Sequence, residues 1–219
     1  MRALIRRVLL FTLFTTIASP GLAVNLVTNP SFAGNLTGWM TGWNYDTGTT
    51  FDPANDATGV PGSGSAKNTF VFPVVGNAVF AIGQCIAAGP GTYTLGGNVL
   101  IPSGQAAGGW GNIFVEFSPT PGCRPANGFL PPYSVGVGTS TTGSFQTLSR
   151  QVTAPEGTVS ILISGQSNPS TTGTHTVNFD DFVLDNGLAA PAAVPALGPL
   201  GLLALLAAMA VTGFSLLRR

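Results

Sequence analysis

"GNIFVEFS", residues 111–118, alternates apolar side chains with others at every second position. Ile113, Val115 and Phe117 fall on one face of an extended chain, whereas Glu116 and a further phenylalanine fall on the opposite face. This alternation is typical of a strand that covers a hydrophobic core with one of its faces. The stretch therefore predicts a β-strand, and the sequence on either side of it continues the pattern.

Similar alternation occurs in "GTYTLGGNVLI" at 91–101 and in "GTVSILISG" at 157–165. Turn-forming Gly, Pro and Ser residues separate these stretches, as expected for short antiparallel strands. The sequence has no long amphipathic helical pattern and no repeat of about 20–50 residues. Eight or nine strands within residues 24–187 predict an all-β domain, a two-sheet antiparallel jelly-roll sandwich. Further predicted strands span residues 39–45, 66–72, 78–87, 144–153 and 174–184.

The N-terminal residues 1–23 have the composition of a secretory signal peptide. Three arginines precede the apolar run "VLLFTLFTTIA", and small residues follow it. We expect cleavage after Ala23, and an uncleaved anchor helix is the alternative.

The C-terminal residues 197–219 begin with 21 residues that carry no charge and end in two arginines. As a helix, the apolar part would be about 30 Å long, which is one bilayer. It is predicted to be a transmembrane helix with a cytoplasmic C-terminus, and a buried core helix is the alternative. Residues 188–196, rich in Pro and Ala, are predicted to be a linker.

The charged residues are few and unevenly distributed. Of 219 residues, 30 are Gly, 17 are Pro and only 7% are charged. Outside residues 1–23 and 197–219, three basic residues stand against eight acidic ones, a net charge of −5. Such a surface disfavours nucleic acid and other polyanions, and it suits neutral or cationic ligands.

Three features of the C-terminus carry a resemblance to a sorting signal: "VPALGPLG" at 194–201, the apolar span and the final "RR". Together they resemble the PEP-CTERM signals of exported Gram-negative proteins, most closely the IPTL-CTERM variant, although Val-Pro-Ala-Leu stands in place of Ile-Pro-Thr-Leu. The resemblance implies processing near Val194-Pro195 by an exosortase-like enzyme. The protein would be anchored in the inner membrane with a periplasmic domain, then reach the cell surface or the extracellular space. A permanent single-pass anchor is the alternative.

Two stretches at opposite ends of the domain resemble the galactose-binding-like jelly rolls, which include many carbohydrate-binding modules. They are "NLVTNPSFAGNLTGW" at 25–39 and "HTVNFDDFVLDNG" at 175–187. The resemblance implies a sandwich whose first loop is fastened by a core tryptophan. The matching positions of the first pattern are Asn29, Phe32, Gly38 and Trp39.

Asp180 and Asp181 interrupt the alternation of the last predicted strand, which predicts a β-bulge at this point. In many resembling modules a carboxylate after the Phe and a late Asp hold a structural calcium ion. Here Ala33 replaces the first carboxylate, but Asp180 is still a candidate calcium ligand. The alternative is that the Asp side chains are solvated or hydrogen-bond an adjoining loop.

Exposed aromatic rings are the candidate ligand-binding residues, because they stack on the apolar faces of sugars. The candidates are Trp110, expected in a Gly-rich loop, together with Trp43 and Tyr133. Cys85 and Cys123 are the only cysteines, and export to an oxidising compartment predicts a disulfide between them, with two free thiols as the alternative.

No catalytic residues are predicted. The chain has a single histidine, His175, no Gly-x-Ser-x-Gly elbow, and an Asp pair whose members point to opposite faces of a strand. The sequence therefore predicts an exported, non-enzymatic module that binds carbohydrate or exopolysaccharide. The alternative is a structural or adhesive surface protein without a small ligand.

Overall fold

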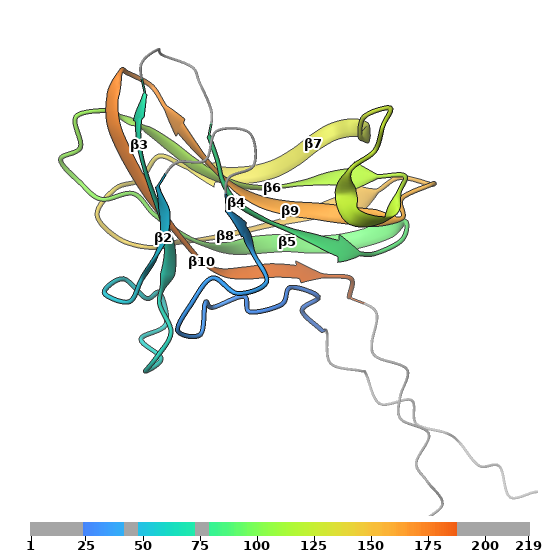
Figure 1. Ribbon diagram of the computed structural model, residues 1–219, viewed down its shortest axis with the longest axis horizontal. Coiled ribbons are helices and arrows are strands. Elements are labelled where there is room, and N and C mark those ends of the chain that lie inside the picture. Colours follow the sequence, from blue (N-terminus) through green and yellow to red (C-terminus); the bar gives the residue numbers. More distant parts are fainter. Residues whose placement is uncertain (1–23, 42–47, 73–78, 188–219) are drawn as a thin grey trace, which may run out of the picture. The chain divides into compact units, whose positions relative to one another are not determined.

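The computed structural model describes residues 24–41, 48–72 and 79–187, and in it two antiparallel sheets pack face to face (Figure 1). The first sheet has the order β1 (Met40–Thr41), β4 (Val79–Ala87), β9 (Ser160–Pro169), β6 (Gly109–Ser118) and β7 (Leu130–Thr139). The second has the order β2 (Thr49–Asp52), β3 (Ser65–Phe72), β10 (Gly173–Asp185), β5 (Gly91–Leu100) and β8 (Gln146–Ala154). The predicted all-β, two-sheet antiparallel sandwich is confirmed.

Helix is scarce in the described residues, where a single 3-10 turn, η1 (Pro121–Cys123), lies between β6 and β7. Within these ranges, no helix has the length and apolar character needed to cross a membrane. The predicted signal peptide (1–23), linker (188–196) and C-terminal helix (197–219) lie outside the described residues.

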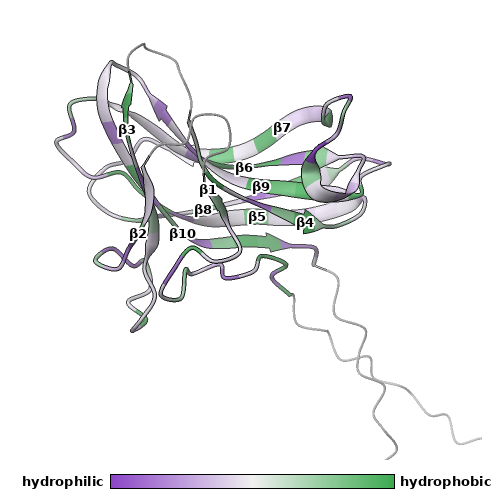
Figure 2. Cartoon of the chain, viewed as in Figure 1, coloured by the Kyte–Doolittle hydropathy of each residue, from purple (hydrophilic) through white to green (hydrophobic). Residues whose placement is uncertain are grey.

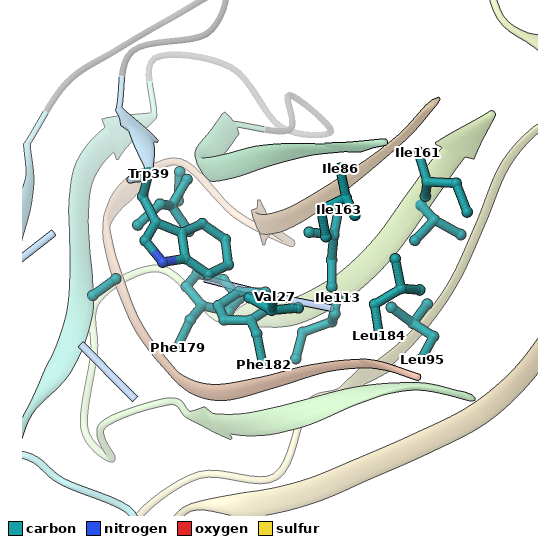
Figure 3. Packing of buried hydrophobic residues seen from close by; sticks show 14 of the residues in the cluster. Val27, Trp39, Ile86, Leu95, Ile113, Ile161, Ile163, Phe179, Phe182 and Leu184 are labelled. Atoms are coloured by element: carbon teal, nitrogen blue, oxygen red, sulfur yellow. The ribbon is translucent and has the colours of Figure 1, made fainter. Parts of the chain in front are cut away.

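The core lies between the sheets, where alternate residues of facing strands meet. Isoleucines of β4, β6 and β9 point toward Leu95 of β5 and toward Phe179 and Leu184 of β10 (Figure 3). Hydrophobic stretches mark β9 and β10 in Figure 2. The alternation in residues 157–165 predicts that Val159 faces inward together with Ile161 and Ile163. This prediction is wrong for Val159, which precedes β9 and is exposed, whereas most other predicted inward positions are confirmed. The confirmed inward residues include Tyr93, Leu95, Val99, Ile101, Ile113, Val115, Phe117, Ile161 and Ile163.

The predicted bulge in β10 is confirmed. The register of β10 against β5 shifts between Asp180 and Val183, and Asp181 adopts a positive φ of 46°. The shift changes which alternate positions face inward, so that apolar residues on both sides of it reach one core. These residues are Val177, Phe179, Phe182 and Leu184.

Two strands were not predicted from the sequence. β7 contains Pro131, Pro132, Gly136 and Gly138, and these residue types are depleted in strands and typical of loops. The structure places β7 at the edge of the first sheet, where a proline need not donate a ladder hydrogen bond. β2, with four residues, is too short for a period to be visible, and it lies at an edge of the second sheet.

Candidate functional site

The outer face of the first sheet carries polar and aromatic side chains along β6. Because Ile113 and Val115 face the core, the alternate residues of β6 face outward. The register of β6 against β9 places Asn168 beside Trp110 and Gln166 beside Asn112. We call this surface the outer β6 face, and define it by Trp110, Asn112, Phe114 and Glu116 with Gln166 and Asn168.

Trp110 lies in β6 rather than in the loop expected from its glycine neighbours, and its side chain is 42% exposed. When the Asn112 amide is oriented so that its oxygen faces donors, this oxygen accepts hydrogen bonds from Trp110 Nε1 at 3.1 Å and from Asn168 Nδ2 at 3.2 Å. The Asn112 nitrogen then donates to the Gly111 carbonyl at 3.3 Å. The indole is thus tethered by its polar edge while part of its surface stays open to solvent.

Beside the indole lie two shallow hollows. The first, of ≈ 340 Å³, is lined by Trp110, Asn112 and three residues at the end of β7, Gly138, Thr139 and Ser140. The second, of ≈ 200 Å³, shares Asn112 and Gly138 with the first, so the two adjoin. Its other lining residues are Phe114, Ser134, Gly136, Val137 and Gln166.

Two glycines of β7 leave room on this surface for side chains of β6. A Cβ at Gly138 would collide with the Asn112 side chain, and a Cβ at Gly136 would lie 2.6 Å from Phe114 Cβ. Real Cβ atoms do not approach so closely, hence these positions need glycine to let the aromatic and amide side chains of β6 lie beside β7. The Gly-Val-Gly pattern of residues 136–138 does not by itself indicate which side chains lie against these glycines.

Glu116 lies on the same face, farther along β6. Its side chain is half-buried, and it makes no hydrogen bond or ion pair within the described part of the chain. The register places it opposite Leu162 of β9, whose other neighbour is Cys85 of β4. Burial among these groups raises the pKa of the Glu116 carboxyl to about 7.

The predicted disulfide joins Cys85 of β4 to Cys123 of η1, with a Cα–Cα distance of 5.7 Å. It links the β6–β7 connection to the other side of β9, because β9 lies between β4 and β6. The Cys123 backbone N–H also donates to Ser160 Oγ at 3.2 Å. One end of the outer β6 face therefore has a covalently fixed border.

The other predicted binding aromatics are not gathered at the hollows. Tyr133 of β7 is 68% exposed, but it lines neither of the two hollows. Trp43 lies outside the described residues. Sequence reasoning did not find Phe114, Ser134 and Gln166, because they become neighbours only when β6, β7 and β9 pair.

Asp180 is fully buried, and both of its carboxylate oxygens accept backbone hydrogen bonds, from Ala57 N at 2.9 Å and from Asp181 N at 2.8 Å. Burial raises the pKa of Asp180 to about 7, although these hydrogen bonds oppose the shift. Asp181 accepts hydrogen bonds from Ser31 Oγ at 2.6 Å and from Asn98 Nδ2 at 2.9 Å. Both carboxylates therefore fasten loops to the bulge.

Calcium binding at Asp180 stays a prediction. A calcium ion takes about six to eight oxygen ligands, and in the described residues no three His, Cys, Asp or Glu side chains are placed to hold a metal ion. The observed hydrogen bonds to the Ala57 loop fit the other expectation, in which Asp180 holds an adjoining segment of the chain.

His175 is fully buried at the start of β10, and its Nδ1 shares a hydrogen bond of 2.8 Å with Ser167 Oγ. Burial lowers the pKa of the imidazole, so the ring is neutral near pH 7. Ser167 is fully buried too. This pair lies inside the sandwich, which fits a packing role rather than contact with a substrate.

No protein-family model and no curated protein matches the sequence. Among solved structures, the CBM22-1 xylan-binding domain of Paenibacillus barcinonensis Xyn10C matches with a TM-score of 0.53 at 14% identity, covering 78% of this chain and 100% of that domain. The enzymatically active domain of bacteriophage CBA120 tailspike protein 4 matches with a TM-score of 0.52 at 18% identity, covering 73% of this chain. This chain spans only 21% of that tailspike structure.

A family 16 carbohydrate-binding module also matches, with a TM-score of 0.49 at 17% identity, covering 73% of this chain and 99% of that module. At such identities the likeness concerns the fold. The described domain is a jelly-roll sandwich of the kind found in carbohydrate-binding modules.

Proposed function

We propose that this domain binds a carbohydrate chain such as an exopolysaccharide on the outer β6 face, without cleaving it. The observation that carries the proposal is the half-exposed Trp110 indole, tethered by Asn112 beside a hollow of ≈ 340 Å³. This volume is within the range of about 300–1,000 Å³ typical of small-molecule sites.

The chemistry of this surface suits a neutral sugar. An aromatic plane offers an apolar surface to the C–H side of a sugar ring, whereas amide groups both donate and accept hydrogen bonds and can pair with hydroxyls. Asn112, Gln166 and Asn168 place three such amides around Trp110. The fold likeness to carbohydrate-binding modules supports the same proposal.

The proposal includes export. The sequence of residues 1–23 supports secretion, and that of residues 194–219 supports sorting by an exosortase-like enzyme after transient anchoring in the inner membrane. The protein would then act at the cell surface or in the extracellular matrix. Cell fractionation, with mass spectrometry of the mature C-terminus, tests this part of the proposal independently of sugar binding.

Sugar binding is tested with a glycan array and calorimetry on the full exported protein. Trp110→Ala is expected to weaken binding by about five- to a hundredfold, if the indole contributes as much as an aromatic ring that stacks on a nucleobase, about 1–3 kcal/mol. Val71→Ala, which shortens an exposed side chain on the second sheet, is the matched control and should bind normally. Tyr133→Ala shows whether the binding surface extends beyond the hollows. Equal binding by wild type and Trp110→Ala would contradict the proposed site.

A further inference from the structure

We infer that Glu116 is a specificity-determining residue that selects glycans carrying a protonated amine, a deepening that rests on the proposed function. Glu116 lies on the outward face of the same strand as Trp110 and Asn112. Trp110 and Glu116 are six positions apart, which is about 20 Å at roughly 3.3 Å per residue of a strand. A chain of several sugar rings could contact both ends of this surface.

The carboxyl group of Glu116 has no partner in the described part of the chain. It is half-buried, and no described residue donates a hydrogen bond to it or forms an ion pair with it. Its register neighbour Leu162 is apolar, and the adjacent cysteine is held in the disulfide. A carboxylate that is partly removed from water without compensation gains more from an incoming positive charge than a solvated one does. The raised pKa of Glu116, about 7, has the same physical cause.

Within residues 24–41, 48–72 and 79–187, no charged group forms an ion pair with Glu116. The neighbours of Glu116 on β9 are uncharged, namely Leu162 and Ser164. On the other adjoining elements the titratable residues are Tyr133 of β7 and Arg124, which follows η1, and neither forms an ion pair with Glu116. β4 contributes Cys85, which does not titrate in the disulfide.

The negative net charge of the whole domain also favours a positively charged ligand. Outside the terminal segments, three basic residues stand against eight acidic ones, so an acidic polysaccharide would be repelled. A protonated amine is the group that satisfies both this acidic surface and the isolated carboxylate. The ligand class that follows is a polysaccharide containing free amino sugars.

The test compares three hexasaccharides by titration calorimetry at pH 6: β-1,4-linked glucosamine, its fully N-acetylated form, and cellohexaose. We expect the wild-type protein to bind the glucosamine hexamer at least about tenfold more tightly than the other two, the effect of one hydrogen bond to a charged group. Glu116→Gln should lose this preference, so that the variant binds the glucosamine hexamer no more tightly than its N-acetylated form. Glu156→Gln, which makes the same substitution at an exposed position in the turn before β9, should retain the preference.

Proton release gives a second readout that a merely structural role would not produce. At pH 6 the free Glu116 carboxyl is largely protonated, so binding of an amine should expel its proton. Titrations in two buffers of different ionisation enthalpy should detect this release in the wild type and not in Glu116→Gln.

Two outcomes would overturn the inference in different ways. Sugar binding without an amine preference, or an amine preference that survives in Glu116→Gln, refutes the role of Glu116 and leaves the proposed function intact. Absence of binding to every glycan by the wild type refutes the proposed function and the inference together.

Discussion

Trp39 Nε1 donates a hydrogen bond to the backbone carbonyl of Asn29 at 3.0 Å, while its ring lies 4.6 Å from that of Phe182. The turn-rich opening of the domain is thereby fixed to the strand that closes it, more than 140 residues later. The Asn29 side chain continues the fastening, because its Nδ2 donates to the carbonyls of Asn35 and Thr37. The predicted packing role of this tryptophan is confirmed.

Truncation of the two described tryptophans should therefore lower the free energy of unfolding by very different amounts. Trp39→Ala removes a buried ring and its hydrogen bond, and we expect a loss of about 3–5 kcal/mol in the free energy of unfolding. Trp110→Ala changes a half-exposed side chain, and we expect only about 0.5 kcal/mol. Urea unfolding followed by circular dichroism measures both. Similar losses in the two variants would contradict the assignment of one ring to the core and the other to the surface.

The disulfide should contribute measurably to stability. Cys85 and Cys123 are 38 residues apart, so in the chain-entropy model their link is worth about 3–4 kcal/mol. The double variant Cys85→Ala/Cys123→Ala should lose about this amount in urea unfolding. The wild type under reducing conditions should lose a similar amount, whereas the double variant should not respond to reductant. A response of the double variant would show that the reductant acts elsewhere.

Stability should decrease as the pH rises from about 4.5 toward 7. Burial raises the pKa of Glu116 from 4.5 to about 7, so in this window the folded state holds a proton that the unfolded state has lost. The contribution of the protonated carboxyl is complete at acid pH and disappears above about pH 7. Glu116→Gln should therefore raise the melting temperature at pH 8 relative to the wild type and show no such gain at pH 4. Glu156→Gln serves as the exposed control, and an identical pH profile in the two variants would contradict the burial of Glu116.

Removal of calcium with a chelator distinguishes the two expectations for Asp180, that it binds calcium or that it hydrogen-bonds an adjoining loop. If its carboxylate only holds the Ala57 and Asp181 N–H groups, EDTA leaves the melting temperature of the wild type unchanged. Asp180→Ala should then destabilise the domain by about 2–4 kcal/mol, since it removes the acceptor of two part-buried N–H groups. A rise in melting temperature with millimolar calcium that is absent in Asp180→Asn would instead establish the predicted calcium site.

Gly138→Ala should impair binding more than folding. Its new Cβ would collide with the Asn112 amide and displace the group that tethers Trp110. Loss of one hydrogen bond of about 1 kcal/mol predicts roughly fivefold weaker glycan binding. Ser140→Ala, at the rim of the same hollow, is the control. Unchanged affinity in Gly138→Ala would show that the orientation of Asn112 does not matter for the ligand.

Local patterns were sufficient for much of the fold. A period of two identified most strands and their inward residues, because alternation along a strand depends on backbone geometry alone. The broken alternation at Asp180 and Asp181 indicated the bulge for the same reason. The two edge strands could not be predicted, since the prolines of β7 and the shortness of β2 hide any period.

The candidate site depended on contacts that no local pattern encodes. Sequence alone placed Phe114 on the outward face of a strand but placed Trp110 in a loop. The structure puts both on one face of β6, where Trp110 is 42% exposed and Phe114 only 4%. Likewise, the sequence identified Asp180 as a candidate functional residue. It did not identify the N–H group of Ala57, 123 positions away, that donates a hydrogen bond to the Asp180 carboxylate. Periodicity fixes the face on which a side chain lies, but exposure and partners depend on which distant strands and loops pack over that face, and only the tertiary structure decided these.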